Sequence, residues 1–512
     1  MKMNWKRVGS IMVVSLIAVA VSLMGLELLR PKRDMSNWQN EVGTMYQIFV
    51  YSFADSNNDG VGDIQGIIEK LDYLEELGVN GIWLTPVHPS QSYHKYDVED
   101  YYAIDEQFGT LADFEQLIAE IHERDMKIVM DMVFNHTSNL HPWFVDVKTN
   151  PESQYRDYYA LNDNTDPDFP RVGAWHQLNA TEHYYGFFSP NMPELNLDNP
   201  QVIQEWQNVL QFWLKKGVDG FRFDAVKHFY NQGELKVIED PTQQAVEVLQ
   251  QLKRAAQQIN PNVYFVSEVW LNTSAMAPYY AGNDALFQFD LAEAMIKAVN
   301  RGETGYIQQY VENMTRFQAV NPEAMMTQFL TNHDQSRVMS AVFQDQERAR
   351  LAASLLLTLP GTSYLYYGEE LGMLGVKPDE RIREPFPWQA DGLGGETTWE
   401  VVKLNQNIAS VAEQQENPAS LYNHYRTMIK LRATHSQLVT GKVDVIETTS
   451  KSKLVNYKLE NSDGKIQVIH NLSKNSQEVR IDDVNATAIY GTITGGKAVL
   501  PPFSSAIIAL AE

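Results

Sequence analysis

The 512-residue chain contains no cysteine. Disulfide bonds, a thiol nucleophile, cysteine-based metal sites and a cysteine-linked lipid anchor are therefore all excluded. Positive charge is also scarce, because 41 Lys and Arg stand against 65 Asp and Glu, for a formal net charge of −24. Nucleic-acid binding requires clustered Lys and Arg, so this balance argues against a nucleic-acid partner. It fits a soluble protein that acts on a neutral substrate, although acidity can also serve solubility alone.

One long apolar run is present, near the N-terminus. Basic residues within 2–7 precede the run, which extends from Ile11 to Leu26. A positive segment followed by an apolar one is typical of a secretory signal. The run is slightly short for a membrane span, but a retained anchor is the alternative. We therefore expect residues 1–38 to be a signal peptide or membrane anchor. The protein would be extracellular (secreted), or else anchored to the outer face of the cell membrane.

Short apolar runs rich in Val, Ile, Phe and Tyr recur along the chain and predict eight strands. They cover residues 44–53, 79–86, 127–134, 218–224, 263–269, 285–290, 325–330 and 362–367. Between them, apolar residues recur at spacings of three and four, as in 64–77, 111–121 and 202–213, which indicates helices. Eight strands that alternate with helices predict an α/β fold, a closed (β/α)8 TIM barrel. A doubly wound open sheet is the alternative.

Two segments depart from this alternation. About sixty residues after the third run show no clear period, and a connection of that length is usually functional or a small domain. We therefore predict a barrel formed by 39–136 and 199–436, with a subdomain inserted after strand 3 at 137–198. From 437 to 512, short strands alternate with turns, which predicts a C-terminal antiparallel β domain, a β-sandwich.

Polar residues end four of the predicted strands. In a closed barrel, the C-terminal ends of the strands converge on one pocket. Unpaired buried charges are costly, so four such strand ends predict an active site, although structural ion pairs would explain any one of them. The spacing of the histidines matches no zinc pattern. The residues are Asp131, Asn135 and His136; Arg222, Asp224, Lys227 and His228; Glu268; and His333 and Asp334.

The three acids at these ends fit the hydrolysis of a glycosidic bond. That reaction needs a proton donor for the leaving oxygen and a carboxylate to attack or stabilise the anomeric carbon. Arg222 lies two residues before Asp224 on the same strand face, and we expect it to keep Asp224 ionised, as a nucleophile requires. Glu268 is then the candidate acid and base. Asp334 could bind sugar hydroxyls and favour a cationic transition state.

These four segments, together with Met192-Pro-Glu-Leu-Asn196, occur in order from about residue 40 onward. They resemble the conserved segments of the α-amylase superfamily, glycoside hydrolase family 13. The resemblance implies that Asp224 is the nucleophile, Glu268 the acid/base and Asp334 the transition-state stabiliser. It also implies a set of sugar-binding residues around the point of cleavage, although a structural role is the alternative for the tyrosine among them. They are Tyr96, His136, Arg222, Lys227, His228 and His333.

The type of activity within the superfamily is indicated by several departures. The α-glucosidases and oligo-1,6-glucosidases usually carry an Asp three residues before the stacking tyrosine, whereas this chain has Tyr93. The pair Lys227 and His228 resembles the α-amylase form. Residues 383–388 resemble a segment typical of the glucosidases, and Glu194 replaces a commoner Asp. The whole resembles the α-amylases of the intermediate group between oligo-1,6-glucosidases and neopullulanases.

We therefore expect a monomeric α-amylase (EC 3.2.1.1). It would cleave internal α-1,4 bonds of starch and maltooligosaccharides, with retention and a covalent glycosyl-enzyme intermediate. The alternatives are α-glucosidase, oligo-1,6-glucosidase or neopullulanase activity, and a transglycosidase with the same site. A non-catalytic, amylase-like membrane subunit is a remote alternative, because such subunits have generally lost the acids retained here.

A polar loop after the first predicted strand suggests a calcium site. Oxygen-bearing groups at alternate positions around a glycine turn suit a hard cation such as Ca²⁺. The loop is not an EF-hand, because its twelfth position is Gly66 rather than Glu. It resembles a calcium loop of the oligo-1,6-glucosidase and intermediate groups, and a simple polar turn is the alternative. The expected ligands are Asp55, Asn57, Asp59, Val61 and Asp63.

Overall fold

The computed structural model describes residues 38, 42–162, 174–230, 240–449 and 451–511. The chain divides into two compact units, Met1–Trp38 and Gln39–Glu512, and the fold below is that of the second. The apolar run of the predicted signal or anchor lies outside the described residues. None of the helices within the described ranges combines the length and apolar character that a bilayer crossing requires.

Eight parallel strands close into a barrel in the order β1-β11-β10-β9-β8-β7-β3-β2. Each lies within one of the eight predicted runs, so the closed barrel is confirmed and the open sheet is wrong. Two runs extend beyond their strands into helices, because Val50–Phe53 at the end of the run 44–53 is helical, and Asp290 at the end of the run 285–290 belongs to the first turn of the next helix. The strands are β1 (Thr44–Ile48), β2 (Gly81–Leu84), β3 (Lys127–Met132), β7 (Gly220–Phe223), β8 (Tyr264–Ser267), β9 (Ala285–Phe287), β10 (Met325–Phe329) and β11 (Thr362–Tyr366).

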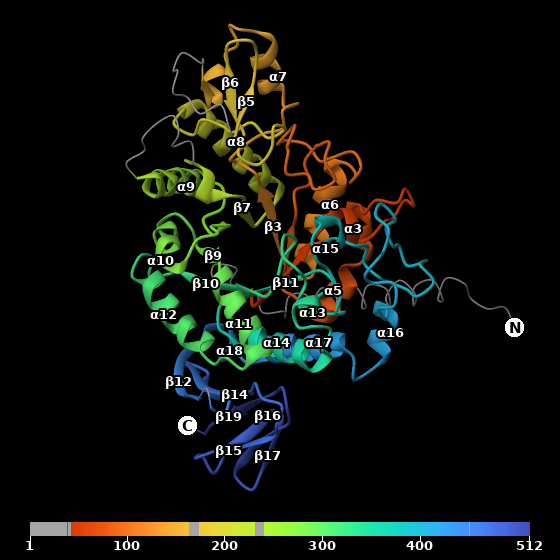
Figure 1. The fold of residues 1–512 in the computed structure, drawn as a ribbon, viewed down its shortest axis with the longest axis vertical. Coiled ribbons are helices and arrows are strands. Elements are labelled where there is room, and N and C mark those ends of the chain that lie inside the picture. Colours follow the sequence, from red (N-terminus) through yellow and green to blue (C-terminus); the bar gives the residue numbers. More distant parts are fainter. Residues whose placement is uncertain (1–37, 39–41, 163–173, 231–239, 450, 512) are drawn as a thin grey trace, which may run out of the picture. The chain divides into compact units, whose positions relative to one another are not determined.

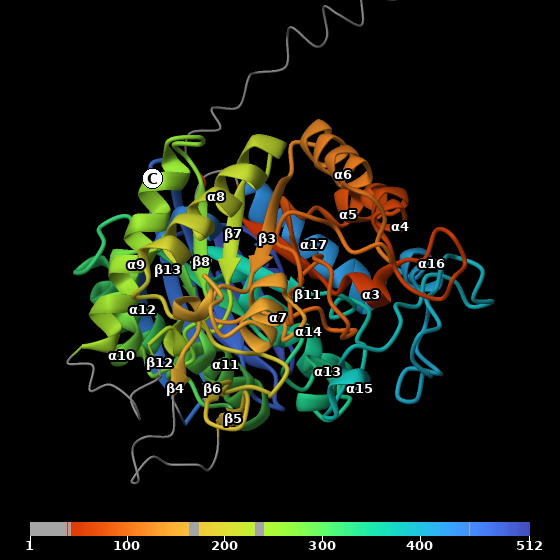
Figure 2. The ribbon, with the colours of Figure 1, turned by 90° about the horizontal axis from the view of Figure 1, so that it is seen from above.

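Helices surround these strands, as Figure 2 shows from above. The longer ones are α4 (Ile64–Glu69), α5 (Leu71–Leu77), α6 (Leu111–Glu123), α8 (Pro200–Lys216), α9 (Pro241–Gln257), α11 (Phe289–Arg301), α12 (Tyr306–Gln318), α14 (Gln346–Thr358) and α17 (Leu421–Thr434). Further helices, none longer than α4, are α3 (Val50–Phe53), η2 (Val226–His228), α10 (Thr273–Met276), η3 (Ala277–Ala281), α13 (Val338–Ala341), α15 (Asp379–Ile382), α16 (Val411–Glu416) and α18 (Gln437–Thr440).

Helix α8 illustrates how the sequence sets these elements. The Asn199 side chain accepts a hydrogen bond from the amide of Gln201, and Pro200 occupies the first turn, where no amide hydrogen is needed. The apolar residues recur every three to four positions and bury one face, which includes Trp206 and Trp213. Gly217 ends the helix with φ of 106°, a left-handed conformation that glycine adopts without strain.

The segment between β3 and β7 forms the inserted subdomain. Its described part contains α7 (Pro142–Thr149), η1 (Arg156–Tyr158) and a small sheet in the order β4-β6-β5. The strands are β4 (Leu161–Asn162), β5 (Trp175–Gln177) and β6 (His183–Tyr185). The segment returns to the barrel through backbone pairing of Glu194 with His136, and within the segment Tyr159 pairs with Leu195. A subdomain after strand 3 is therefore confirmed.

Antiparallel strands form the C-terminal part of the chain. One sheet has the order β12-β13-β14-β19-β16, and a second has the order β15-β18-β17. The strands are β12 (Lys442–Thr449), β13 (Leu454–Asn461), β14 (Gly464–Asn471), β15 (Gln477–Arg480), β16 (Thr487–Tyr490), β17 (Thr492–Thr494), β18 (Lys497–Leu500) and β19 (Ser504–Ala509). The first sheet packs against α14 and α18 (Figure 1). The predicted C-terminal β domain is confirmed, while the boundaries at 136, 198 and 436 stay predictions.

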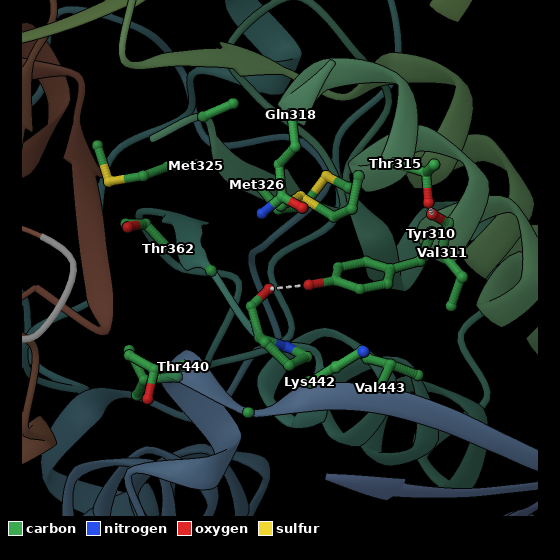
Figure 3. A pocket seen from close by; sticks show the side chains of 16 residues that line it. Tyr310, Val311, Thr315, Gln318, Met325, Met326, Thr362, Thr440, Lys442 and Val443 are labelled. Atoms are coloured by element: carbon green, nitrogen blue, oxygen red, sulfur yellow. Dashed lines mark hydrogen bonds between the residues drawn. The ribbon is translucent and has the colours of Figure 1, made fainter. Parts of the chain in front are cut away.

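A cavity of about 480 Å³ lies where the barrel meets the first C-terminal strand (Figure 3). Its lining includes the first residues of β10 and β11, Met325 and Thr362, and Lys442 at the start of β12. The Tyr310 hydroxyl donates a hydrogen bond to the carbonyl oxygen of Pro360 beside it, at 3.3 Å. Its lining contains no carboxyl side chain and lies at the N-terminal strand ends. It is therefore separate from the acids that the sequence places at the other ends.

Candidate active site

A second cavity, of about 600 Å³, lies at the C-terminal ends of the barrel strands. All three predicted catalytic acids line it, as do five of the six predicted sugar-binding residues. The sixth, Arg222, contacts two of the acids from beneath and is only 1% exposed. The predicted residues in the lining are Tyr96, His136, Asp224, Lys227, His228, Glu268, His333 and Asp334.

The Arg222 guanidinium joins three carboxyl groups. Its Nη1 donates to Asp224 Oδ1 at 2.6 Å and to Asp131 Oδ1 at 2.8 Å. Its Nη2 donates to Glu268 Oε2. The pairing of β3 with β7 places Asp131 directly beside Arg222, and the next strand, β8, leads into Glu268. The strand register therefore gathers three acids around one cation.

One positive charge does not offset the burial of three carboxyls. Burial raises the pKa of Asp224 to about 6, against the opposing effect of Arg222. Burial also raises the pKa of Glu268 to about 7, and the charges of Asp224 and Asp334 add to this rise. Arg222 thus favours the ionised form of Asp224, as predicted, but burial is the larger effect. Glu268 is the group that retains its proton to higher pH.

Asp334 lies at the end of β10 in a different environment. Its Oδ1 accepts a hydrogen bond from Arg383 Nη2 at 3.0 Å, and its Oδ2 lies 3.2 Å from His333 Nε2. Burial acts to raise the pKa of Asp334, but His333 and Arg383 outweigh it and hold the pKa below its usual value. Asp334 is therefore ionised under conditions in which Glu268 is partly protonated.

Tyr96 and His333 form a stacked pair on the cavity wall. Their rings are 5.4 Å apart with an interplanar angle of 5°, and the Tyr96 hydroxyl lies 2.7 Å from His333 Nε2. The same hydroxyl donates to Asp131 Oδ2 at 3.1 Å. On the opposite side of the imidazole, Gln47 Nε2 lies 2.7 Å from His333 Nδ1. This network fixes the orientation of an aromatic face that a sugar ring can contact.

The arrangement matches a known family. The pattern described as "Alpha amylase, catalytic domain" matches residues 47–441, most of the chain. The chain belongs to the α-amylase family. It is therefore a glycoside hydrolase family 13 enzyme, with chemistry directed at glycosidic bonds.

Other members of the α-amylase family resemble this chain over nearly its full length. Alpha-amylase 3 of Dictyoglomus thermophilum is 39% identical over 473 residues, which cover 90% of this chain and 92% of that protein. A 4-alpha-glucanotransferase of Thermotoga maritima is 33% identical, with 84% and 95% covered. An oligo-1,6-glucosidase of Bacillus cereus is 31% identical, with 80% and 86% covered. This mixture is consistent with the intermediate group named from the sequence.

A solved structure supports the same assignment. The crystal structure of an alpha-amylase from H. orenii superposes with a TM-score of 0.84 at 36% identity, and covers 92% of this chain and 100% of that one. The barrel and its C-terminal β domain are thus shared with an α-amylase family member over the whole length of that protein.

The sequence did not predict several residues that line or support the active-site cavity. Asp131 was predicted as one of the polar strand ends but without a role; it contacts Arg222 without lining the cavity, and an acid in a buried strand is a usable signal. Arg383 reaches Asp334 from the segment after β11, and no sequence pattern indicates that pairing. The other missed lining residues are His94, Phe188, Ser189, Met192, Ala225, Trp270, Lys377 and Asp379.

Tyr93, the departure from the α-glucosidase pattern, is not part of the cavity lining. Its ring stacks on Trp399, with centroids 5.0 Å apart and an interplanar angle of 23°. Its hydroxyl accepts a hydrogen bond from Arg383 Nη1 at 3.4 Å. Tyr93 therefore contacts the cavity wall from behind, through Arg383, rather than facing a sugar directly.

The predicted calcium loop connects β1 and α3 to α4. Asp55 Oδ1 accepts from the amide of Asn58 at 2.7 Å, and Asp55 Oδ2 accepts from that of Gly60 at 2.8 Å. Asp63 accepts from the Ser56 hydroxyl at 2.8 Å and caps α4. The oxygen donors suit a hard cation. However, among the described residues no group of three or more His, Asp or Glu side chains is placed to hold a metal ion.

Proposed function

We propose that this enzyme hydrolyses internal α-1,4-glucosidic bonds of starch and maltooligosaccharides with retention of configuration. The observation that carries the proposal is the Arg222 bridge, which brings Asp224 and Glu268 onto one guanidinium. The two carboxyls are close enough for a hydrogen bond between them to contribute to the raised pKa of Glu268. Retaining glycosidases need such close carboxyls, whereas inverting ones leave room for a water molecule.

The first half of the reaction uses both carboxyls. The Asp224 carboxylate attacks the anomeric carbon and forms a glycosyl ester, while the bond from that carbon to the glycosidic oxygen breaks. Protonated Glu268 gives its proton to the departing oxygen. A pKa of about 7 keeps that proton available near neutral pH.

The second half releases the sugar. Glu268, now a carboxylate, takes a proton from water as the water oxygen attacks the same anomeric carbon, and the bond to Asp224 breaks. In both steps the ionised Asp334 stabilises the positive charge that develops on the sugar ring. Two inversions at one carbon give retention.

The cavity surface supports a polymeric sugar substrate. Trp270 and Phe188 are 46% and 45% exposed and line the cavity, as Lys227 and His228 do. Aromatic faces and hydrogen-bond donors together suit a row of glucose units. We infer endo action because Lys227 and His228, the pair that resembles the α-amylase form, both line the cavity.

Endo action is tested with a maltooligosaccharide blocked at its non-reducing end. We expect cleavage of this substrate, with the α-anomer as the first product detected by NMR. An enzyme that requires a free non-reducing end would leave the blocked substrate intact and would be an α-glucosidase. The unblocked oligosaccharide is the matched control, because both enzyme types cleave it.

Glycosyl transfer is the second candidate, favoured by the similarity to a protein named 4-alpha-glucanotransferase. The same glycosyl-enzyme would then react with a sugar hydroxyl instead of water. Chromatography of products at high oligosaccharide concentration separates the two activities. Mainly longer or cyclic products would indicate a transferase, while activity on pullulan or isomaltose would indicate α-1,6 cleavage.

We further propose that the loop containing Asp55, Asn57, Asp59 and Asp63, with the carbonyl of Val61, binds Ca²⁺. The loop is linked to the segment behind the active site, because the Gly60 carbonyl accepts hydrogen bonds from the amides of Thr398 and Trp399, and Trp399 stacks on Tyr93. A bound cation would stabilise the folded state in proportion to its affinity. We expect a chelator to lower the melting temperature, Ca²⁺ to restore it, and Asp59→Asn to abolish both changes. An unchanged melting temperature would contradict the proposal.

We also propose that the protein is exported and acts outside the cell as a monomer. The support is the basic and apolar N-terminal sequence described above. Cell fractionation followed by N-terminal sequencing tests this, with a shortened, extracellular protein as the expected result. A full-length protein in the membrane fraction would favour the anchored alternative, and a cytoplasmic one would contradict export.

A further inference from the structure

Arg383 is buried in the wall of the active site, with only 3% of its surface exposed. Its three guanidinium nitrogens contact three different partners. Nη2 donates to Asp334 Oδ1 at 3.0 Å, Nε donates to the carbonyl oxygen of His333 at 3.0 Å, and Nη1 donates to the Tyr93 hydroxyl at 3.4 Å. The side chain therefore links the segment after α15 to the end of β10, where Asp334 lies.

The charge of Arg383 is directed mainly at Asp334. Burial lowers the pKa of His333 to about 3, so this imidazole is neutral near pH 7 and supplies no positive charge beside Asp334 there. Tyr93 is also uncharged, because burial raises its pKa to about 12. Asp379 lies 3.6 Å from Arg383 Nη2, but it is itself paired with Lys377. Arg383 is thus the permanent cation in contact with the Asp334 carboxylate.

The planar guanidinium also fixes geometry. Nε and Nη2 donate to the His333 carbonyl oxygen and to the Asp334 carboxylate, which belong to consecutive residues. The rigid guanidinium therefore fixes the Asp334 carboxylate relative to the backbone beside it. Tyr93 opposes rotation of the guanidinium. Its hydroxyl accepts a hydrogen bond from Nη1, and its ring lies beneath the guanidinium, with 5.6 Å between the ring centre and Arg383 Cζ. The uncharged Tyr93 does not compete with Asp334 for the positive charge.

We propose that Arg383 is a positioning residue that acts through Asp334. It orients the Asp334 carboxylate and keeps it ionised, so that the carboxylate faces the positive charge that develops on the sugar. This inference rests on the proposed function, because it assigns Asp334 to the transition state. A misplacement of about 1 Å in such a group can cost roughly 100-fold in rate. The loss is expected in kcat, since Asp334 is most needed in the transition state.

A double-mutant cycle tests the proposal with a 4-nitrophenyl maltooligosaccharide, whose good leaving group keeps weak variants measurable. We expect Arg383→Gln to lower kcat about 100-fold with KM changed less than about threefold. In an Asp334→Asn background, the same substitution should have almost no further effect, because its partner is already lost. Arg383→Lys, which keeps the charge without the guanidinium, should give an intermediate kcat and serves as the cycle partner if the Gln variant fails to fold.

Arg381→Gln is the matched control, because it removes a positive charge from α15 at a residue outside the cavity lining, and it should leave kcat unchanged.

Inhibitor binding separates this role from a purely structural one. In Arg383→Gln, a cationic iminosugar should lose more affinity than maltose does. A structural role would lower the melting temperature and reduce both affinities alike. The inference would be overturned if Arg383→Gln and Asp334→Asn lowered kcat independently of each other. It would also be overturned if Arg383→Gln kept a kcat near that of the unsubstituted enzyme. Absence of cleavage by the unsubstituted enzyme would instead contradict the proposed function.

Discussion

The two walls of the active-site cavity place the same type of side chain in opposite electrostatic environments. On one wall, three carboxyls share the single guanidinium of Arg222, and burial raises the pKa of Asp224 and Glu268. On the other, Asp334 has Arg383 as its own cation and the neighbouring His333, and its pKa is held below the usual value despite burial. Burial acts to raise the pKa of each of these acids, and only at Asp334 do the neighbouring positive groups outweigh it.

This difference suits a reaction that needs both states at once. A proton donor must be protonated at the pH where its neighbours are ionised. In the proposed mechanism the crowded wall supplies the donor, because burial and, after it, the neighbouring negative charges disfavour ionisation of Glu268. The wall with Arg383 supplies a carboxylate that stays negative throughout. Changes to either wall should therefore have distinguishable effects.

The largest effect is expected on the crowded wall, from Asp224→Asn. An amide of the same shape cannot attack the anomeric carbon, so we expect kcat to fall by roughly 10⁴-fold or more, with oligosaccharide binding retained. Reducing-sugar release and isothermal titration with maltooligosaccharide measure the two quantities. Near-normal turnover in this variant would show that another group is the nucleophile.

Arg222→Met should have the next largest effect, on stability. Removing the cation leaves buried carboxyls unpaired, which typically costs about 3–5 kcal/mol of unfolding free energy. Arg222 lowers the pKa of all three carboxyls, so in its absence their folded-state pKa values lie further above the unfolded ones. The unfolded values are the same for both proteins, so the loss should grow as pH rises through the folded-state pKa values of the parent enzyme, about 6 to 7, and be smaller at pH 4 than at pH 8.

Urea unfolding at the two pH values measures this loss. Arg124→Gln is the control, because Arg124 forms its ion pairs at the partly exposed surface and should matter by about 1 kcal/mol or less. A pH-independent loss for Arg222→Met would mean that packing, not charge, accounts for it.

Asp131→Asn should have the smallest effect, on the pH profile. Beyond burial, the charge of Asp131 raises the pKa of Asp224, and removing it leaves Arg222 freer to favour the ionised form. The acid limb of kcat/KM, which requires ionised Asp224, should move to lower pH by on the order of one unit. If the acid limb stays at the same pH or moves to higher pH, the sharing of the Arg222 charge among carboxyls does not distinguish the two walls.

The sequence was sufficient for much of this site because some of its signals are local. Arg222 and Asp224 are two residues apart on one strand, so their contact follows from the period of a strand. The alternation of apolar runs with helical spacings was enough to predict the closed barrel, and a closed barrel brings strand ends together whatever the loops contain. Asp131 could have been added to the prediction, as a charge within a buried strand.

Other features depended on contacts between distant segments. Whether Asp131 lies beside Arg222 depends on the register of β3 with β7, which are separated by the whole inserted segment. Tyr93 stands where the α-glucosidases usually carry an Asp, but only its stacking on Trp399 shows that it lies behind Arg383. No periodicity within one segment can indicate which loop will cover another.

The amino-acid sequence by itself therefore determined the barrel and the family, because these depend on hydrophobic period and on short ordered segments, and it predicted three acids that the structure places in one cavity. Only the tertiary structure decided how many carboxyls share each cation. Burial and neighbouring charge set a pKa, and both are properties of the packed site rather than of any one segment. The sequence supplied acids of nearly equal intrinsic strength, and folding made Glu268 weaker and Asp334 stronger.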